Sequence, residues 1–362
     1  MSAKDLVGRV DQAAFTIARL QPHDAASGSD HLQALRSLVV TDQLRYPGIR
    51  TWFDDKVVPG LSTGERTAYV AYVHGQPVAS AILKRGRDTK LCNLRVREEW
   101  QGLDLGRILF SLMVLEVRGI ATQLHFSLPE SLWAKKKAFF EAFGFTSAYR
   151  ARRQYRHGDP ELVCSQEFSC VWRSVLEVLS NLLTGGSSEA HGDSPGLLIS
   201  IKPAYWDQIA AGDKVFEFRR RVGRGWTGVR ALLYASRPVC SLVGEVKLEA
   251  MISGDPEQIW RQCARGAGVQ QEDFQTYVTS ASRLWAVRLA DVRPFRHPIP
   301  IARLAELLGC SLRPPQSFYR LQEANAAPWR AAAYLARLLQ HCTRGLTEAG
   351  SQAGLEGSRV RV

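Results

Sequence analysis

The chain has 362 residues, of which 45% are hydrophobic and 23% are charged. At about 100–200 residues per domain, this length predicts two domains, and the apolar fraction excludes a mainly disordered chain. Lysine and arginine outnumber aspartate and glutamate by 47 to 35, which gives a formal net charge of +12. Such a surplus favours a nucleic acid or another anionic ligand as partner, although many basic enzymes bind no nucleic acid.

Neither the apolar runs nor the cysteines indicate a membrane or secreted protein. No run approaches the roughly 18 uncharged apolar residues that would span a bilayer, and the N-terminus has no signal-peptide pattern. None of the seven cysteines forms a C-x-x-C pair, and Cys92, Cys240 and Cys310 stand among apolar neighbours. We therefore expect a cytoplasmic protein with reduced thiols and no Cys/His metal site.

The first half of the chain alternates strands and helices. Apolar patterning predicts strands at Phe15–Arg19, Ala68–Val73, Pro77–Lys84, Lys90–Val96 and Leu124–Leu128. Apolar residues at helical spacing predict helices at His31–Arg45, Leu105–Arg118 and Leu132–Phe143. Interleaved elements of this kind indicate an α/β fold with a mixed central sheet and flanking helices.

Composition also sets the expected domain boundaries. Residues 184–195 (TGGSSEAHGDSP) are rich in Gly, Ser and Pro, and they predict a flexible linker between a domain at 1–183 and another at 196–322. Residues 323–362 are expected to form a C-terminal helix, which the sequence PWRAAAYLARLLQHC indicates, followed by a disordered tail.

A glycine-bearing loop follows the strand that ends at Val96, and a helix begins near Leu105. The N–H groups at a helix N-terminus can hold a pyrophosphate where glycine allows a close approach. The alternative is that Gly102 and Gly106 serve only a tight turn.

This loop resembles the acyl-CoA-binding motif of the GNAT N-acetyltransferase superfamily, (Arg/Gln)-x-x-Gly-x-(Gly/Ala). Gln101, Asp104 and Gly106 occupy its fixed positions. AKKKAFFEAFGF at residues 134–145 is similar to the superfamily's second signature, and the resemblance covers about residues 15–155. It implies an N-acetyltransferase that takes acetyl-CoA as donor, bound by Leu94, Val96, Gln101, Gly102, Leu103, Asp104, Leu105, Gly106 and Arg107.

Two residues depart from the superfamily's pattern. Asp104 replaces the central glycine of the loop. Aspartate tolerates left-handed backbone angles, but its carboxylate would repel a pyrophosphate unless Arg107 offset the charge. Phe140 stands where the superfamily often places a tyrosine that protonates the leaving thiolate, and phenylalanine cannot donate a proton.

The expected transfer needs a base and an N–H donor. An amine must lose a proton as it attacks the thioester, and a backbone N–H must hold the developing oxyanion. Glu130, just past a strand, is the favoured base, and His125 is a candidate proton relay. The alternatives are a helix-capping role for Glu130 and a core position for His125.

The domain at 196–322 begins with an apolar strand, a helix at Tyr205–Ala211 and a strand on which Glu217 and Arg219 face one side. Five motifs there resemble the ASCH family: S-I-K-P, G-x-K-x-x-E-x-R, Y-A-S-x-P, G-E-V and P-P-Q-S, at residues 200–203, 212–219, 234–238, 244–246 and 314–317. The resemblance implies an α+β, PUA-like β-barrel associated with RNA.

Some ASCH proteins remove acetyl groups from acetylated cytidine with a lysine, a threonine and a glutamate. Lys214 matches that lysine and Glu245 that glutamate, but Glu217 stands at the threonine position. By their own chemistry, five charged residues are expected to form a mixed-charge pocket for phosphate and base. These residues are Lys202, Lys214, Glu217, Arg219 and Glu245. A structural ion pair is the alternative.

Basic residues also stand near a tryptophan. Arg220, Arg221 and Arg224 precede Trp226, and charge beside a stacking surface is typical of single-stranded nucleic-acid binding. The alternative is a solvated basic loop.

The leading hypothesis is an N-acetyltransferase that uses acetyl-CoA, needs no metal and acts on RNA or a nucleoside presented by the second domain. The alternatives are acetylation of a protein amine, amidohydrolysis of acylated nucleosides, and a non-enzymatic regulator that binds acetyl-CoA and RNA. No membrane partner is expected, and the oligomeric state is left open.

Overall fold

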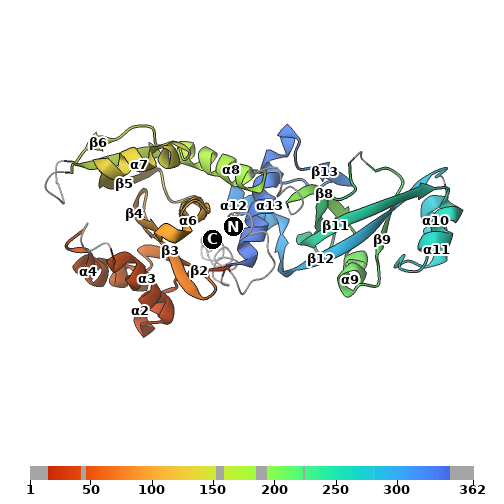
Figure 1. Ribbon diagram of the computed structural model, residues 1–362, viewed down its shortest axis with the longest axis horizontal. Coiled ribbons are helices and arrows are strands. Elements are labelled where there is room, and N and C mark those ends of the chain that lie inside the picture. The colour runs from red at the N-terminus through yellow and green to blue at the C-terminus, as the bar shows by residue number, and fades with distance from the viewer. Residues whose placement is uncertain are drawn as a thin grey trace, which may run out of the picture. The chain divides into compact units, whose positions relative to one another are not determined.

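A computed structural model of the chain describes residues 15–41, 46–151, 159–184, 194–222, 225–279 and 281–342 (Figure 1). The chain divides into two compact units: Met1–Leu182 together with Arg337–Val362, called unit 1, and Leu183–Ala336, called unit 2. Residues 185–193 of the predicted linker and residues 343–362 of the predicted tail lie outside the described residues.

Unit 1 is built on a seven-stranded mixed sheet with the order β1-β2-β3-β4-β5-β7-β6. Its strands are β1 (Phe15–Arg19), β2 (Arg66–Val73), β3 (Gln76–Lys84), β4 (Asp88–Val96), β5 (Gln123–Pro129), β6 (Tyr149–Arg150) and β7 (Glu161–Glu167). Neighbouring strands are antiparallel except β4 and β5, which are parallel. The mixed sheet and its five predicted strands are confirmed, whereas the sequence analysis missed β6 and β7.

Helices cover both faces of this sheet (Figure 1). On one face, α6 (Leu105–Glu116) and α7 (Glu130–Glu141) pack through aromatic rings, with Phe110 against Phe139 and Phe143. Apolar residues of the helices on the other face pack on Val70 and Ile82. These helices are α2 (Pro22–Ser27), α3 (Asp30–Val40), α4 (Ile49–Trp52), η1 (Phe53–Val57) and α5 (Val58–Ser62).

The helix predicted at His31–Arg45 is α3, which ends at Val40 with Thr41 as its C-cap. Residues 42–45 lie outside the described residues. The sequence analysis missed α2, α4 and α5, because helices of four to six residues are too short to show a 3.6-residue period. A longer helix, α8 (Phe168–Thr184), follows β7 directly.

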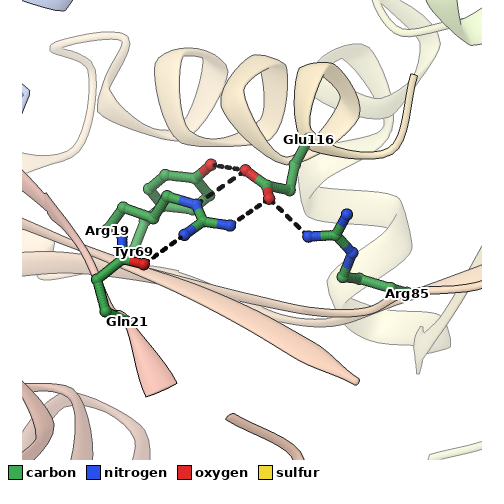
Figure 2. Close-up of polar contacts among 5 residues, drawn as sticks. All are labelled: Arg19, Gln21, Tyr69, Arg85 and Glu116. Atoms are coloured by element: carbon green, nitrogen blue, oxygen red, sulfur yellow. Dashed lines mark hydrogen bonds and ion pairs between the residues drawn. The ribbon is translucent and has the colours of Figure 1, made fainter. Parts of the chain in front are cut away.

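Glu116, the last residue of α6, is the centre of a buried polar network (Figure 2). Arg19 donates from Nε at 3.1 Å and from Nη2 at 2.5 Å, Arg85 donates at 2.8 Å, and the Tyr69 hydroxyl donates at 2.7 Å. Burial alone would lower the pKa of Arg19, but the hydrogen bond and charge of Glu116 raise it above its ordinary value. The network therefore ties α6 to β1, β2 and the end of β3.

The C-terminal helix, α13 (Ala327–Gln340), leads into a short segment that pairs with β1. Ile17 donates its N–H to the carbonyl oxygen of His341 at 2.8 Å, and Ile17 and Cys342 form a parallel bridge. The Nδ1 atom of His341 lies 3.1 Å from the carbonyl oxygen of Phe15. Because β1 is an edge strand, these contacts pair backbone groups that a bare edge would leave open.

Unit 2 contains a six-stranded sheet with the order β13-β8-β10-β11-β12-β9. Its strands are β8 (Pro195–Ile201), β9 (Phe216–Arg219), β10 (Arg230–Ala235), β11 (Ser241–Gly254), β12 (Leu284–Pro300) and β13 (Phe318–Arg320). Within the described part of the chain, no backbone pairing joins β9 to β13. The α+β character is as expected, but the closed barrel is not confirmed.

Helices of unit 2 flank this sheet. The predicted helix α9 (Pro203–Ala211) follows β8, whereas α10 (Pro256–Cys263), α11 (Gln271–Val278) and α12 (Ile301–Leu308) were not predicted. α10 and α11 lie at one end of the long β11–β12 hairpin (Figure 1), where Phe274 packs on Phe218 and Trp260. No helix among the described residues is both long and apolar enough to cross a bilayer.

Replacing Glu116 tests the network that holds α6. We expect Glu116→Ala to lower the free energy of unfolding by about 3 kcal/mol, because two arginines and a tyrosine would lose their shared buried acceptor. Urea unfolding followed by circular dichroism measures the change. Glu65→Ala is the control, since it removes an ion pair with Lys84 whose side chains are 50% and 47% exposed. Equal effects of the two variants would contradict the structural role of Glu116.

Candidate functional site

The parallel strands β4 and β5 separate after three residue pairs. Their register comprises Asp88 with Gln123, Thr89 with Leu124, and Lys90 with His125. On the β3 side, Leu91 pairs with Leu83 and Asn93 with Ile82, so that Cys92 forms a β-bulge. A bulge bends its strand, and this one lies two residues beyond the last pair with β5. Beyond Lys90, the described part of β4 continues to Val96 without strand pairing to β5. We call this part of the sheet the β4–β5 fork.

The loop after β4 lies at the open end of the fork. Gly102 and Asp104 both have left-handed backbone angles, with φ of 85° and 56°, so aspartate does adopt the conformation that a glycine favours. α6 begins at Leu105, and the Asp104 side chain makes no capping bond to it. The N–H groups of Leu105, Gly106 and Arg107 thus lie in the uncapped first turn of a helix, where an anion is favoured.

Arg107 lies beside Asp104, as the sequence analysis expected, and Gln101 has a contact that was not predicted. The Nη1 atom of Arg107 lies 2.6 Å from Oδ1 of Asp104, which offsets the acidic charge. The side chain of Gln101 donates to the carbonyl oxygen of Val96 at 3.2 Å and so fixes the loop on β4. Leu103 is half-buried and Leu105 is buried, so only the backbone of Leu105 can contact a ligand.

The structure adds two α7 residues that the sequence analysis did not single out. Lys136 donates to the side-chain oxygen of Gln101 at 2.9 Å, which brings a second cation to the loop. A Cβ atom on Gly106 would lie 3.3 Å from the Phe139 ring and 3.8 Å from Cγ2 of Val96. A side chain at 106 would therefore meet the Phe139 ring closely enough that this ring would have to shift by a few tenths of an ångström. The basic run AKKK was the only sequence signal for Lys136.

Phe140 is held in an aromatic stack. Its ring lies 4.6 Å from the ring of Phe126 in β5 and 5.7 Å from that of Trp133, and both pairs are close to parallel. The side chain at the position of the expected tyrosine is thus fixed by packing and offers no proton.

The candidate base His125 lies within β5, whereas Glu130 directly follows that strand. His125 belongs to the last pair before the fork, and its Nδ1 atom lies 2.8 Å from Oδ1 of Asp88. Its side chain is 25% exposed, so it is not a core residue. Glu130 is the first residue of α7, half-exposed, and forms an ion pair with Arg150 at 3.4 Å. Four strand residues stand between the two, and the five residue steps correspond to about 17 Å along the strand direction.

In unit 2, Lys214 is buried, with 2% of its surface exposed. Its ammonium donates to the carbonyl oxygen of Ala267 at 2.6 Å and lies 3.9 Å from Oε2 of Glu217. The rings of Tyr205 and Phe218 lie 4.9 and 5.3 Å from it. Burial lowers the pKa of Lys214, and the charge of Glu217 opposes that shift only in part.

Arg219 joins this lysine to the edge of the sheet. As predicted, it faces the same side as Glu217, with Nε 3.0 Å from Oε1 of that carboxylate. It also donates to the Ser317 hydroxyl at 3.1 Å and to the carbonyl oxygen of Ser200 at 2.8 Å. A side chain of β9 thus bridges to β8 and to the residue before β13, across the opening where backbone pairing is missing. We call Lys214, Glu217, Arg219 and Ser317 the Lys214 cluster.

Glu245 pairs with an arginine that is not part of the Lys214 cluster. Its carboxylate is 4.0 Å from Nε of Arg230, and both residues are 2% exposed. Arg230 also forms an ion pair with Asp291, whose φ of 42° is left-handed. Glu245 extends from the central strand β11 and Arg230 from the neighbouring strand β10, so this ion pair joins two adjacent strands.

The remaining predicted residues of unit 2 lie near its surface or in its core. Lys202 is exposed, with its ammonium 5.7 Å from the Tyr205 ring. Arg220 and Arg221 are exposed as well. Arg224 lies outside the described residues. Trp226 is fully buried and packs edge-on against Phe318 at 4.9 Å, so the expectation that it offers a stacking surface is wrong.

Lys214→Met separates a ligand-binding role from a structural ion pair. We expect the free energy of unfolding to stay within about 1 kcal/mol of the parent value, because methionine keeps the stem and removes a charge that burial disfavours. Arg230→Met is the matched variant, equally buried, and should cost about 3 kcal/mol because two carboxylates would lose their cation. Urea unfolding compares them. Equal losses would make Lys214 a structural residue.

No protein-family model matches the chain. Solved acetyltransferases are among the structures with similar folds. The acetyltransferase from Thermus thermophilus is 22% identical, with 42% of this chain and 97% of that chain covered and a TM-score of 0.28. A putative GNAT-family acetyltransferase from Desulfovibrio desulfuricans is 20% identical, with 43% and 99% covered and a TM-score of 0.34.

A second group of similar proteins comes from Zymomonas mobilis. The solved ASCH structure from that organism is 32% identical, with 37% of this chain and 92% of that chain covered and a TM-score of 0.34. A curated ASCH domain-containing ribonuclease from Zymomonas mobilis subsp. mobilis is 33% identical over 131 residues, which are 36% of this chain and 87% of the relative. The chain therefore belongs to the ASCH domain family, and solved GNAT acetyltransferases are among the structures that it resembles.

Proposed function

We propose that this protein is an acetyl-CoA-dependent N-acetyltransferase whose second unit binds the acceptor, an RNA or a nucleoside. The observation that carries the proposal is the β4–β5 fork, with the uncapped N-terminus of α6 at its open end. Together they provide backbone groups for an extended pantetheine arm and N–H donors for a pyrophosphate.

The residues around the fork fit such a donor. The N–H groups of Leu105, Gly106 and Arg107 suit phosphate oxygens, and Arg107 and Lys136 add positive charge. A donor molecule whose phosphates are bound at this loop extends back along β4, past Val96 and Leu94. Its thioester end then lies toward the narrow end of the fork, near His125.

This direction makes His125 a better base than Glu130. With Nδ1–H donated to Asp88, Nε2 of His125 can accept the proton of the attacking amine. The new bond joins the amine nitrogen to the acetyl carbon, the carbon–sulfur bond breaks, and a β4 N–H holds the oxygen. Phe140 cannot donate a proton to the leaving sulfur. The proton that His125 takes from the amine can then pass to that sulfur.

The second unit supports an RNA or nucleoside acceptor. The Lys214 cluster combines cations with a carboxylate, which suits phosphate oxygens and an exocyclic amine respectively. The curated relative is named as a ribonuclease, which favours RNA as the ligand class. Joining both units in one chain raises the concentration of acceptor at the donor site.

A second candidate function is hydrolysis of RNA or of an acylated nucleoside at the Lys214 cluster. It is favoured by the name of the curated relative and by the buried lysine, whose lowered pKa increases the fraction available as a neutral amine. In that case the fork serves binding only.

Gly106→Glu tests the donor site. We expect acetyl-CoA binding to weaken at least about tenfold, or about 1.4 kcal/mol, because a carboxylate would stand among the N–H groups that hold the phosphates. Isothermal titration calorimetry measures the affinity. Gly48→Glu is the matched control, since a side chain there meets open space, and its affinity should equal that of the parent protein.

A second variant covers the case in which Gly106→Glu displaces Phe139 and α7. Asp104→Gly removes the acidic charge and keeps the left-handed turn, so affinity should rise, more at low salt than at high salt. If the parent protein binds no acetyl-CoA, the proposed function fails. Binding without transfer to RNA or nucleosides would instead indicate a regulator, and transfer to protein amines alone would indicate a protein N-acetyltransferase.

Incubation of the protein with RNA in the absence of acetyl-CoA tests the second candidate. Hydrolysis at the Lys214 cluster predicts cleaved RNA or released acyl groups, detected by mass spectrometry, and predicts loss of that activity in Lys214→Met. An activity that survives in this variant, or an inactive parent protein, would contradict it.

A further inference from the structure

Burial of Trp226 leaves the basic residues before it without the stacking partner that the sequence suggested. The structure gives Arg220 another aromatic partner, Tyr277, which stands 57 residues away in α11. The guanidinium carbon of Arg220 lies 4.6 Å from the centre of the Tyr277 ring, and Arg220 also donates to the carbonyl oxygen of Tyr277.

Tyr277 is exposed although it is large and aromatic. Its exposed fraction is 38%, while Phe274, one turn earlier in α11, is 4% exposed in the core. Its hydroxyl donates to the carbonyl oxygen of Phe218 at 3.4 Å, so the ring is attached at both its backbone and its tip. A ring fixed in this way loses little freedom when another flat group stacks on it.

The Arg220–Tyr277 pair lies next to the Lys214 cluster. Phe218, which accepts from Tyr277, has its ring 5.3 Å from the ammonium of Lys214. The ring of Tyr205 lies 4.9 Å from the same ammonium, and the exposed Lys202 has its own ammonium 5.7 Å from that ring. Burial raises the pKa of Tyr205, and the charges of Glu217 and Asp273 add to that shift.

We propose that Tyr277 and Arg220 form a second base-binding subsite, so that unit 2 binds a single-stranded RNA segment rather than an isolated nucleoside. One nucleotide would occupy the Lys214 cluster, and the base of its neighbour would stack at Tyr277 while Arg220 attracts the intervening phosphate. Aromatic rings and arginine are the usual surfaces for unpaired bases. The proposal rests on RNA being the ligand of unit 2, and it adds that the unit contacts two neighbouring nucleotides.

Fluorescence anisotropy with a labelled tetranucleotide and calorimetry with a mononucleotide test the subsite. The parent protein should bind the tetranucleotide at least about tenfold more tightly than the mononucleotide. Tyr277→Ala should remove most of that difference and leave mononucleotide affinity within about twofold, whereas Tyr277→Phe should keep most of it. Arg220→Gln should lower tetranucleotide affinity and reduce its salt slope by about one.

Matched variants and ligands exclude simpler explanations. Tyr319→Ala removes a tyrosine of the same unit with the same 38% exposure, and Arg261→Gln removes an exposed arginine of α10. Neither should change RNA affinity. Thermal unfolding establishes that Tyr277→Ala is folded, and an oligoglutamate peptide of equal charge should bind more weakly than RNA.

The outcomes separate this subsite from the proposed function. If mononucleotide and tetranucleotide bind equally, and Tyr277→Ala changes neither, the subsite is overturned while acceptor binding at the Lys214 cluster stands. If the peptide binds as tightly and responds equally to Tyr277→Ala, the surface recognises charge and not bases, which also overturns it. If no nucleotide of any length binds, both proposals fail for unit 2.

Discussion

The buried carboxylate of Glu116 is the constraint on which the proposed donor site depends. It accepts from Arg19, Tyr69 and Arg85, which belong to or directly follow β1, β2 and β3. α6 has 12 residues and is about 18 Å long, so fixing its C-terminal end on three strands also fixes the direction of its N-terminus. The positive charges of Arg19 and Arg85 at this C-terminal end also interact favourably with the helix dipole. The uncapped first turn is thus held beside β4 at the fork.

In unit 2, Arg219 has a comparable role at an opening in the sheet. It pairs with Glu217 on its own strand and donates to Ser200 and Ser317. Because these acceptors lie on three segments of the chain, the guanidinium has little freedom to move. It therefore holds the carboxylate of Glu217 in place, and that carboxylate lies beside Lys214. The lysine itself has 2% of its surface exposed, and burial of that kind favours the neutral amine. One side chain therefore links the shape of the sheet to the chemistry of the cluster.

Local pattern was sufficient for most of unit 1. Strand β1 and the turn at Gly75 lie where alternation and glycine place them, because both signals are properties of adjacent residues. The pattern also identified the loop from Gln101 to Arg107. It was insufficient for Trp226, which stands beside basic residues in sequence yet packs into the core with its side chain 0% exposed. A tryptophan near arginines has the same sequence pattern whether it is buried or exposed.

By itself, the sequence determined five strands of the first sheet, the glycine-bearing loop before α6 and the charged strand at Glu217, since each is a property of adjacent residues. Only the tertiary structure decided which distant side chains meet. It brought Lys136 to the loop, His125 to Asp88 at the narrow end of the fork, Arg220 to Tyr277, and Glu245 to Arg230. The physical reason is that side-chain contacts across a sheet depend on strand order and register, and neither the bulge at Cys92 nor the open edge of unit 2 has a signal in local composition.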